Sequence, residues 1–132
     1  MIIGIGLDLA SVDFWAEALQ DPTTSVIEGT FTEHERADAA RGPTPQAERL
    51  AARFAAKEAF IKALGGSRHG ESPTVSRLDP RLIEVTLDAY GRPALKLHGL
   101  AQDVADTVGV RHIWVSLTHE ATMTAATVIL EG

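Results

Sequence analysis

The sequence has no cysteine and no long apolar run, and these two absences exclude several classes of protein. Without cysteine, the chain can form neither a disulfide framework nor a thiolate metal site, which fits a reducing compartment. The opening segment, MIIGIGLDLA, lacks a basic leader, and its apolar stretch is far shorter than the roughly 18 residues that would suggest a membrane span. We therefore expect a cytoplasmic protein that does not enter a membrane.

Positive charge is also scarce, because the formal net charge is -6 and residues 1–35 contain no Lys or Arg. This balance argues against nucleic acid as a partner, since such binding depends on neutralising phosphates with basic side chains. Four basic residues cluster on residues 47–64, namely Arg49, Arg53, Lys57 and Lys62. We expect the acidic residues of 1–35 and the basic residues of 47–64 to form different surfaces.

A chain of 132 residues with 45% apolar content is enough for one domain with a real core, and we assign residues 1–132 to it. Ser11 predicts the start of one helix, and Thr32 with Glu35 has the capping-box spacing that predicts another. Further helices are predicted at 47–64 and 99–109, a loop at 67–80, and strands at 2–9, 83–88, 93–97, 112–119 and 124–130. The fold class is therefore α+β, with a small, mainly antiparallel sheet packed against a long central helix.

Two carboxylates and a lysine stand out as candidates for chemistry. Glu58 and Lys62 lie between two apolar walls of helix 47–64, where an unpaired carboxylate would be costly, so an i,i+4 ion pair is the simplest interpretation. Asp8, at the end of the first strand, is by itself as readily a turn residue as a ligand. Together, Asp8 and Glu58 suit Mg²⁺, which takes one or two carboxylates and completes its coordination with water and phosphates. With Lys62 facing those phosphates, the three residues outline a phosphoryl-transfer site.

Six segments, in this order along the chain, carry a family resemblance: GIGLD (4–8), FTEHE (31–35), ERLAARFAAKEAFIKALG (48–65), IEVTLDAYGRPALKL (83–97), VSLTHE (115–120) and AATVIL (125–130). Together they resemble the small holo-acyl-carrier-protein synthase group of 4'-phosphopantetheinyl transferases. The resemblance implies that a carrier-protein serine attacks the β-phosphate of coenzyme A. Phosphopantetheine would then remain on the carrier, and adenosine 3',5'-bisphosphate would be released.

The resemblance also implies roles for individual residues. Asp8 and Glu58 would bind the metal, with Glu58, or a water that it orients, as the base for the serine. The phosphate-neutralising lysine falls on Lys62, and the histidine that lies beside the coenzyme phosphates falls on His119, so Glu58, Lys62 and His119 are the expected catalytic residues. Contacts with coenzyme A are expected from Lys62, Gly65, Arg92 and His119.

Other interpretations of these residues remain open. His119 could equally form a satisfied surface pair with its neighbour Glu120. Arg53 and Lys57 lie on a different sector of the helix from Glu58, which favours fold or subunit contacts for them. The alternative function is a non-catalytic subunit that binds coenzyme A or a nucleotide and acts as a regulator or assembly partner. The absence of a GxxxxGK[ST] loop disfavours other small phosphotransferases.

The first helix departs from the family pattern. Members of the family that this chain resembles usually present basic residues on their first helix to an acidic helix of the carrier. In this chain, residues 11–21 read SVDFWAEALQD and are acidic. Either the carrier is unusual, or docking uses Phe14 and Trp15, or the basic surface comes from Arg36, Arg41 or a neighbouring subunit.

The resemblance finally implies a homotrimer with its active site between subunits. We expect the interface to use an apolar sheet face that one short chain cannot easily cover. The residues expected on this face are Ile113, Val115, Leu117, Val128 and Leu130.

Overall fold

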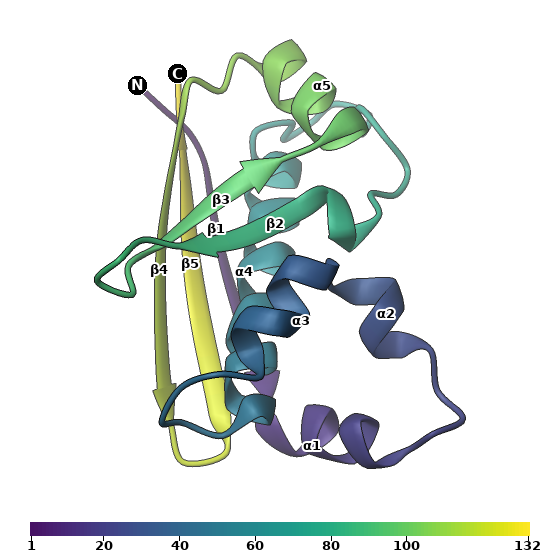
Figure 1. Ribbon diagram of the computed structural model, residues 1–132. Helices are drawn as coiled ribbons and strands as arrows, with labels where there is room; N and C mark the ends of the chain where they lie inside the picture. Colours follow the sequence, from purple (N-terminus) through teal and green to yellow (C-terminus); the bar gives the residue numbers. More distant parts are fainter.

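The computed structural model describes residues 1–132 and centres on a three-stranded antiparallel sheet with one long helix along it (Figure 1). The sheet has the order β1 (Ile2–Ser11), β5 (Met123–Glu131), β4 (His112–Glu120), and the helix is α4 (Gln46–Gly66), of 21 residues. The remaining elements are α1 (Val12–Gln20), α2 (Val26–Thr30), α3 (Glu33–Ala39), a 3₁₀ turn (Pro80–Leu82), β2 (Ile83–Leu87), β3 (Pro93–Leu97) and α5 (Gly99–Val108). The predicted α+β class is confirmed. None of the helices is both long enough and apolar enough to cross a membrane.

Local signals in the sequence located most of these elements correctly. The Ser11 side chain accepts a hydrogen bond from the backbone of Phe14, and Thr32 and Glu35 form the predicted capping box. The short helix α2 and the 3₁₀ turn were not predicted, because five and three residues are too short to show a hydrophobic period. The β2–β3 hairpin also forms a separate two-stranded sheet, and a single-sequence pattern does not specify which hairpin joins which sheet.

Two glycines of β1 allow α4 to approach the sheet closely. Along β1, Gly4, Gly6 and Ala10 are buried, and the side chains of Ile5, Leu7 and Leu9 point away from the helix. A Cβ atom added to Gly6 would lie 1.8 Å from the Ala59 carbonyl oxygen, and one added to Gly4 would lie 2.2 Å from that of Ala63. The helix backbone therefore rests directly on the strand, which brings the side chains at the edge of this contact close together.

We predict that Gly6→Ala destabilises the fold by at least ~3 kcal/mol, because helix and strand must separate to admit the methyl group. Gly29→Ala is the matched control, since nothing lies within 4 Å of a Cβ at that helical position. Thermal unfolding followed by circular dichroism measures both variants. A Gly6→Ala protein that melts within about 2 °C of the parent would contradict the close contact.

A buried ion pair holds the hairpin against the helices. The ammonium group of Lys57 donates to Glu35 Oε1 at 2.7 Å and to the carbonyl oxygens of Pro80 and Ile83 at 2.8 and 2.7 Å. Glu35 Oε2 accepts from the backbone N–H of Val85 at 2.9 Å. The two side chains thus bond backbone groups at the start of β2, whose only strand partner is β3. Lys57 is therefore a residue of the fold, and burial lowers its pKa.

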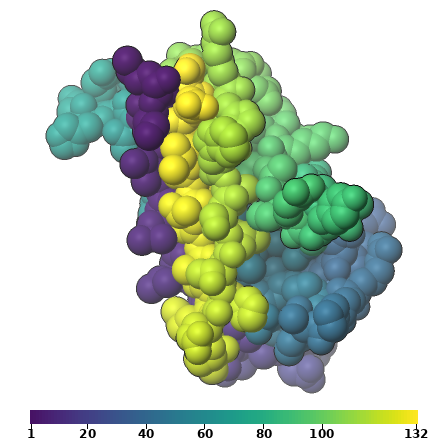
Figure 2. Space-filling model, turned by 90° about the vertical axis from the view of Figure 1, so that its left-hand side faces the viewer, coloured from purple at the N-terminus to yellow at the C-terminus, as the bar shows by residue number.

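The prediction of which sheet face is uncovered was wrong. Val128 and Leu130 are fully buried, and the other three residues named for that face also pack on the core beneath α4. The opposite face is uncovered, as Figure 2 shows for β1, β5 and β4 lying side by side. Large apolar side chains on this face include Ile5, Leu7, Leu9 and Trp114, which are 54 to 63% exposed. Both faces of this sheet carry apolar side chains, so alternation alone could not tell which one the helix covers.

Candidate active site

Asp8 and Lys62 meet where β1 passes the second half of α4. Asp8 follows Gly4 and Gly6 on the helix-facing side of β1, so the close approach of the backbones brings its carboxylate to the helix. Lys62 Nζ donates to Asp8 Oδ1 at 2.8 Å and to the Leu7 carbonyl oxygen at 3.1 Å. The simplest interpretation from sequence, a Glu58–Lys62 pair on the helix surface, is therefore wrong. The lysine instead joins helix to strand.

Glu58 lies beside this pair, and its carboxylate accepts no hydrogen bond. Partial burial raises the pKa of Glu58, the charge of Asp8 raises it further, and Lys62 opposes both effects. Glu58 and Asp8 are therefore near enough to repel each other, and Glu58 retains free oxygen atoms. Such a pair attracts a cation.

The donor set fits Mg²⁺ bound together with a phosphate ligand. No group of three or more His, Cys, Asp or Glu side chains capable of holding a metal occurs in the structure. Two carboxylates match an ion that keeps several waters and takes its remaining oxygens from phosphates. The neighbouring ammonium of Lys62 would face the same phosphates. The arrangement suits phosphoryl transfer better than a closed structural metal site.

His119 lies far from Asp8, Glu58 and Lys62 in the folded chain. Its Nδ1 is 3.4 Å from Oε1 of Glu48, and it forms no ion pair with the side chain of Glu120. Glu48 and Glu58 are ten residues apart on α4, which is ~15 Å at the rise of an α-helix. In addition, β5 separates β4 from β1. A single chain therefore does not bring His119 to Asp8, Glu58 and Lys62.

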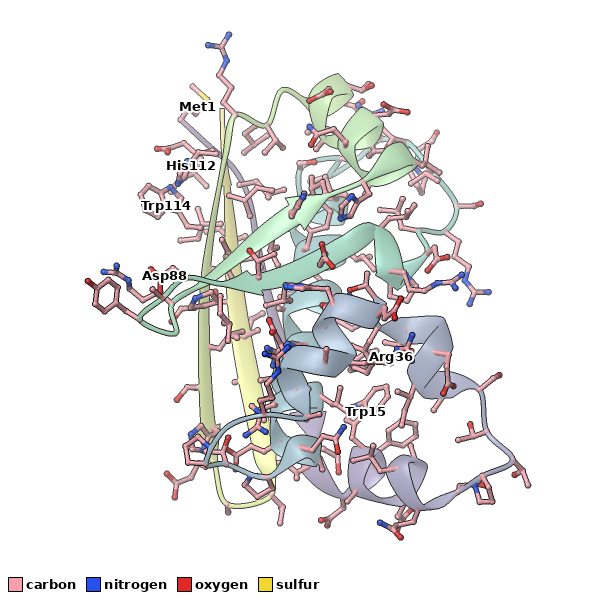
Figure 3. The ribbon with its side chains drawn as sticks, viewed as in Figure 1. Met1, Trp15, Arg36, Asp88, His112 and Trp114 are labelled. Atoms are coloured by element: carbon pink, nitrogen blue, oxygen red, sulfur yellow. The ribbon has the colours of Figure 1, made fainter.

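Gly65 and Arg92 are also far apart. Gly65, in the last turn of α4, lines a pocket of about 190 Å³ with Ile61, Leu64 and the following loop, close to Lys62. Arg92 lies at the hairpin tip, where its Nε donates to Asp88 Oδ2 at 2.6 Å and its guanidinium lies 5.0 Å from the centre of the Tyr90 ring. Asp88 is seen beyond β4, on the side away from α4 (Figure 3). Arg92 therefore belongs to the β4 side of the molecule.

The predicted site residues thus form two groups at opposite edges of the sheet. Asp8, Glu58, Lys62 and Gly65 lie along β1 and the adjoining side of α4. Arg92 and His119 lie near β4, with the hairpin tip beside that strand in Figure 2.

Comparison with known proteins identifies the family. Residues 4–126 match the model of the 4'-phosphopantetheinyl transferase superfamily. The chain is 46% identical to the holo-[acyl-carrier-protein] synthase of Mycolicibacterium paratuberculosis over 131 residues, which cover 98% of this chain and 97% of that protein.

Solved structures agree with the sequence match. The acyl carrier protein synthase of Mycobacterium tuberculosis superposes with a TM-score of 0.76 at 42% identity, covering 99% of this chain and 98% of that one. The ACPS–CoA complex of Chronobacterium ammoniagenes gives a TM-score of 0.86 at 34% identity over 96% of this chain and 95% of that one. The chain therefore belongs to the 4'-phosphopantetheinyl transferase superfamily.

Proposed function

We propose that this protein transfers 4'-phosphopantetheine from coenzyme A to a serine of an acyl carrier protein and releases adenosine 3',5'-bisphosphate. The observation that carries the proposal is the Asp8–Lys62 contact of 2.8 Å beside the free carboxylate of Glu58. The relative from M. paratuberculosis is named for this reaction, and the C. ammoniagenes structure is a complex with coenzyme A. A regulatory subunit that only binds the coenzyme would need neither carboxylate.

In the proposed mechanism, Asp8 and Glu58 would hold Mg²⁺, which would supply positive charge to offset that of the pyrophosphate of coenzyme A. Lys62 donates hydrogen bonds to phosphate oxygens and stabilises the charge that builds on the bridging oxygen. Glu58, or a water that it orients, accepts the proton of the carrier serine. The serine oxygen then bonds to the β-phosphorus, and the bond from phosphorus to the bridging oxygen breaks. No protein residue becomes a covalent intermediate.

The direct test is the mass of an acyl carrier protein co-expressed with this chain. The mass should rise by one phosphopantetheine group, and co-expression with Glu58→Gln should leave the carrier unmodified. A carrier that stays unmodified although the chain binds coenzyme A in calorimetry would instead support the alternative of a non-catalytic binding subunit.

We further propose a cytoplasmic homotrimer. The exposed apolar face that contains Ile5, Leu7, Leu9 and Trp114 supports self-association, because a monomer rarely exposes such a surface. In a ring, each subunit applies one surface to a different surface of its neighbour. The β4 edge of one subunit can then meet the β1 edge of the next, which would unite the two groups of site residues. Light scattering at micromolar concentration should give a trimer mass.

The surface of α1 restricts which carrier this enzyme uses. Asp13, Glu17 and Asp21 are exposed, whereas Trp15 is only 2% exposed and packs against Phe31 and Phe54. Figure 3 shows Trp15 directed into the helical part of the molecule. Trp15 is therefore buried and is not available for direct contact with a carrier. Only Phe14 of the aromatic pair is available for docking, at 53% exposed.

We predict that added salt leaves KM for an acidic carrier flat or lowers it, because salt here screens a repulsion. Reversing two charges in Asp13→Arg/Glu17→Arg should lower KM, chiefly through faster association. Asp103→Arg/Asp106→Arg, two exposed positions of α5, is the matched control because it changes the net charge by the same amount. The measurement is KM across a salt series with coenzyme A saturating. A steep rise of KM with salt in the parent would show that basic residues elsewhere form the docking surface.

A further inference from the structure

Glu48 is a carboxylate in the first turn of α4 for which the proposed mechanism has no use. Its side chain is only 17% exposed, and its carboxylate has a single polar partner, Nδ1 of His119 at 3.4 Å. A carboxylate buried to this extent needs a favourable partner to offset the loss of water. In this structure the partner is His119, whose own side chain is 59% exposed.

The position of Glu48 in the helix does not explain this contact. Negative charge in a first turn is favourable next to the helix dipole, and the N-cap residue Pro45 supplies no side-chain cap to α4. A carboxylate pointing into water would give the same benefit. Around His119, Glu48 is the charged group facing it from α4, Glu120 follows it on β4, and its β5 partner Thr124 is uncharged.

We propose that Glu48 is a positioning residue for His119, holding Nδ1–H so that Nε2 is free to contact a phosphate of coenzyme A. Nδ1 and Oε1 lie at an ion-pair distance of 3.4 Å. Because a carboxylate has no hydrogen to donate, it favours hydrogen on the nitrogen that faces it. In the neutral ring Nε2 is then the acceptor, and in the protonated ring Nε2–H is a donor directed outward. The exposed fraction of His119 fits a ring that is fixed on one side and presented on the other.

This inference rests on the proposed function, because it takes coenzyme A as the ligand of His119. In the proposed trimer, His119 on the β4 edge of one subunit would reach the phosphates that Lys62 and the metal site of the next subunit would hold. The Glu48 contact would fix the ring before the coenzyme arrives, which reduces the entropy lost on binding. The expected effect is on coenzyme affinity more than on the chemical step.

The first test measures the tautomer of the His119 imidazole directly and does not depend on catalytic turnover. In ¹⁵N spectra recorded at about pH 8.5, the parent should show His119 mainly as the Nδ1–H tautomer. Glu48→Ala should shift it toward Nε2–H, and Glu48→Gln, which keeps an acceptor oxygen, should lie between the two. An Nε2–H tautomer in the parent, or a tautomer unchanged in Glu48→Ala, would overturn the proposal.

The second test is a double-mutant cycle in KM for coenzyme A. Glu48→Ala should raise KM about 3- to 10-fold with kcat within about 2-fold, and should add nothing when His119→Ala is already present. Glu33→Gln removes an exposed charge from the first turn of α3 and serves as control. Fully additive effects would show that Glu48 acts on its own and would refute the positioning role. A parent that transfers nothing but shows the expected tautomer shift would refute the proposed function alone.

Discussion

Replacing Asp8 with Asn, or Glu58 with Gln, is expected to lower phosphopantetheine transfer at least ~1000-fold while the protein stays folded. Each change removes one negative charge from the pair that would hold the metal, and neither changes side-chain volume. Asn at position 8 still offers an oxygen to the ammonium of Lys62, so the contact between strand and helix is retained. The measurement is the rate of carrier modification with Mg²⁺ and coenzyme A saturating.

Glu58→Gln should also raise the melting temperature at neutral pH. Burial and the charge of Asp8 raise the pKa of Glu58, so its ionised form is less favourable in the folded state than in the unfolded state. The native state is therefore relatively more stable when Glu58 is protonated, and it loses that advantage as pH rises through the raised pKa. The gain from Glu58→Gln should be largest at neutral pH and should fade as pH falls below the unfolded pKa of ~4.3, where the parent carboxyl becomes protonated in both states.

A matched change elsewhere separates these effects from general loss of charge. Glu33→Gln alters an exposed carboxylate on α3 and should change neither the transfer rate nor the melting temperature appreciably. Parental transfer by either site variant would mean that Asp8 and Glu58 do not hold the metal. A lower melting temperature for Glu58→Gln at neutral pH would contradict the unfavourable position of that carboxylate.

The elements of the fold could be predicted where the cause is local. Ser11 and Thr32 determine helix starts through their own hydroxyl groups, and β2 and β3 alternate clearly on either side of a short turn. The covered face of the main sheet could not be predicted in this way. It depends on Gly4 and Gly6, which admit the α4 backbone on one side of β1, and on the large side chains that consequently face outward.

The same distinction applies to the candidate site. Asp8, Glu58 and Lys62 could be selected from residue type, position and family resemblance, and the structure brings them together. The pairing of Lys62 with Asp8 rather than with Glu58 required the spatial proximity of residues 54 positions apart. Glu48 is the first residue of the segment ERLAARFAAKEAFIKALG. Its contact with His119 could not be predicted, because nothing in the sequence indicates that these residues of α4 and β4 face each other.

Because the site residues form two groups, we expect that mixing two defective chains restores activity. Asp8→Ala should abolish transfer, and His119→Ala should lower kcat/KM for coenzyme A at least ~10-fold. If Asp8 of one subunit works with His119 of the next, a mixed trimer contains some interfaces at which both residues are intact. In a random equal mixture, about a quarter of the interfaces have that arrangement.

Co-expression of the two variants should therefore restore about a quarter of the parental rate at subsaturating coenzyme A, well above the sum of the separate variants. Asp8→Ala mixed with Lys62→Ala is the matched control. These two residues touch within one chain at 2.8 Å, so every subunit in that mixture lacks one of them and no activity should return. If the first mixture also fails although both chains assemble, His119 and Asp8 do not meet across an interface. The exposed apolar sheet face would then need a role other than building the active site.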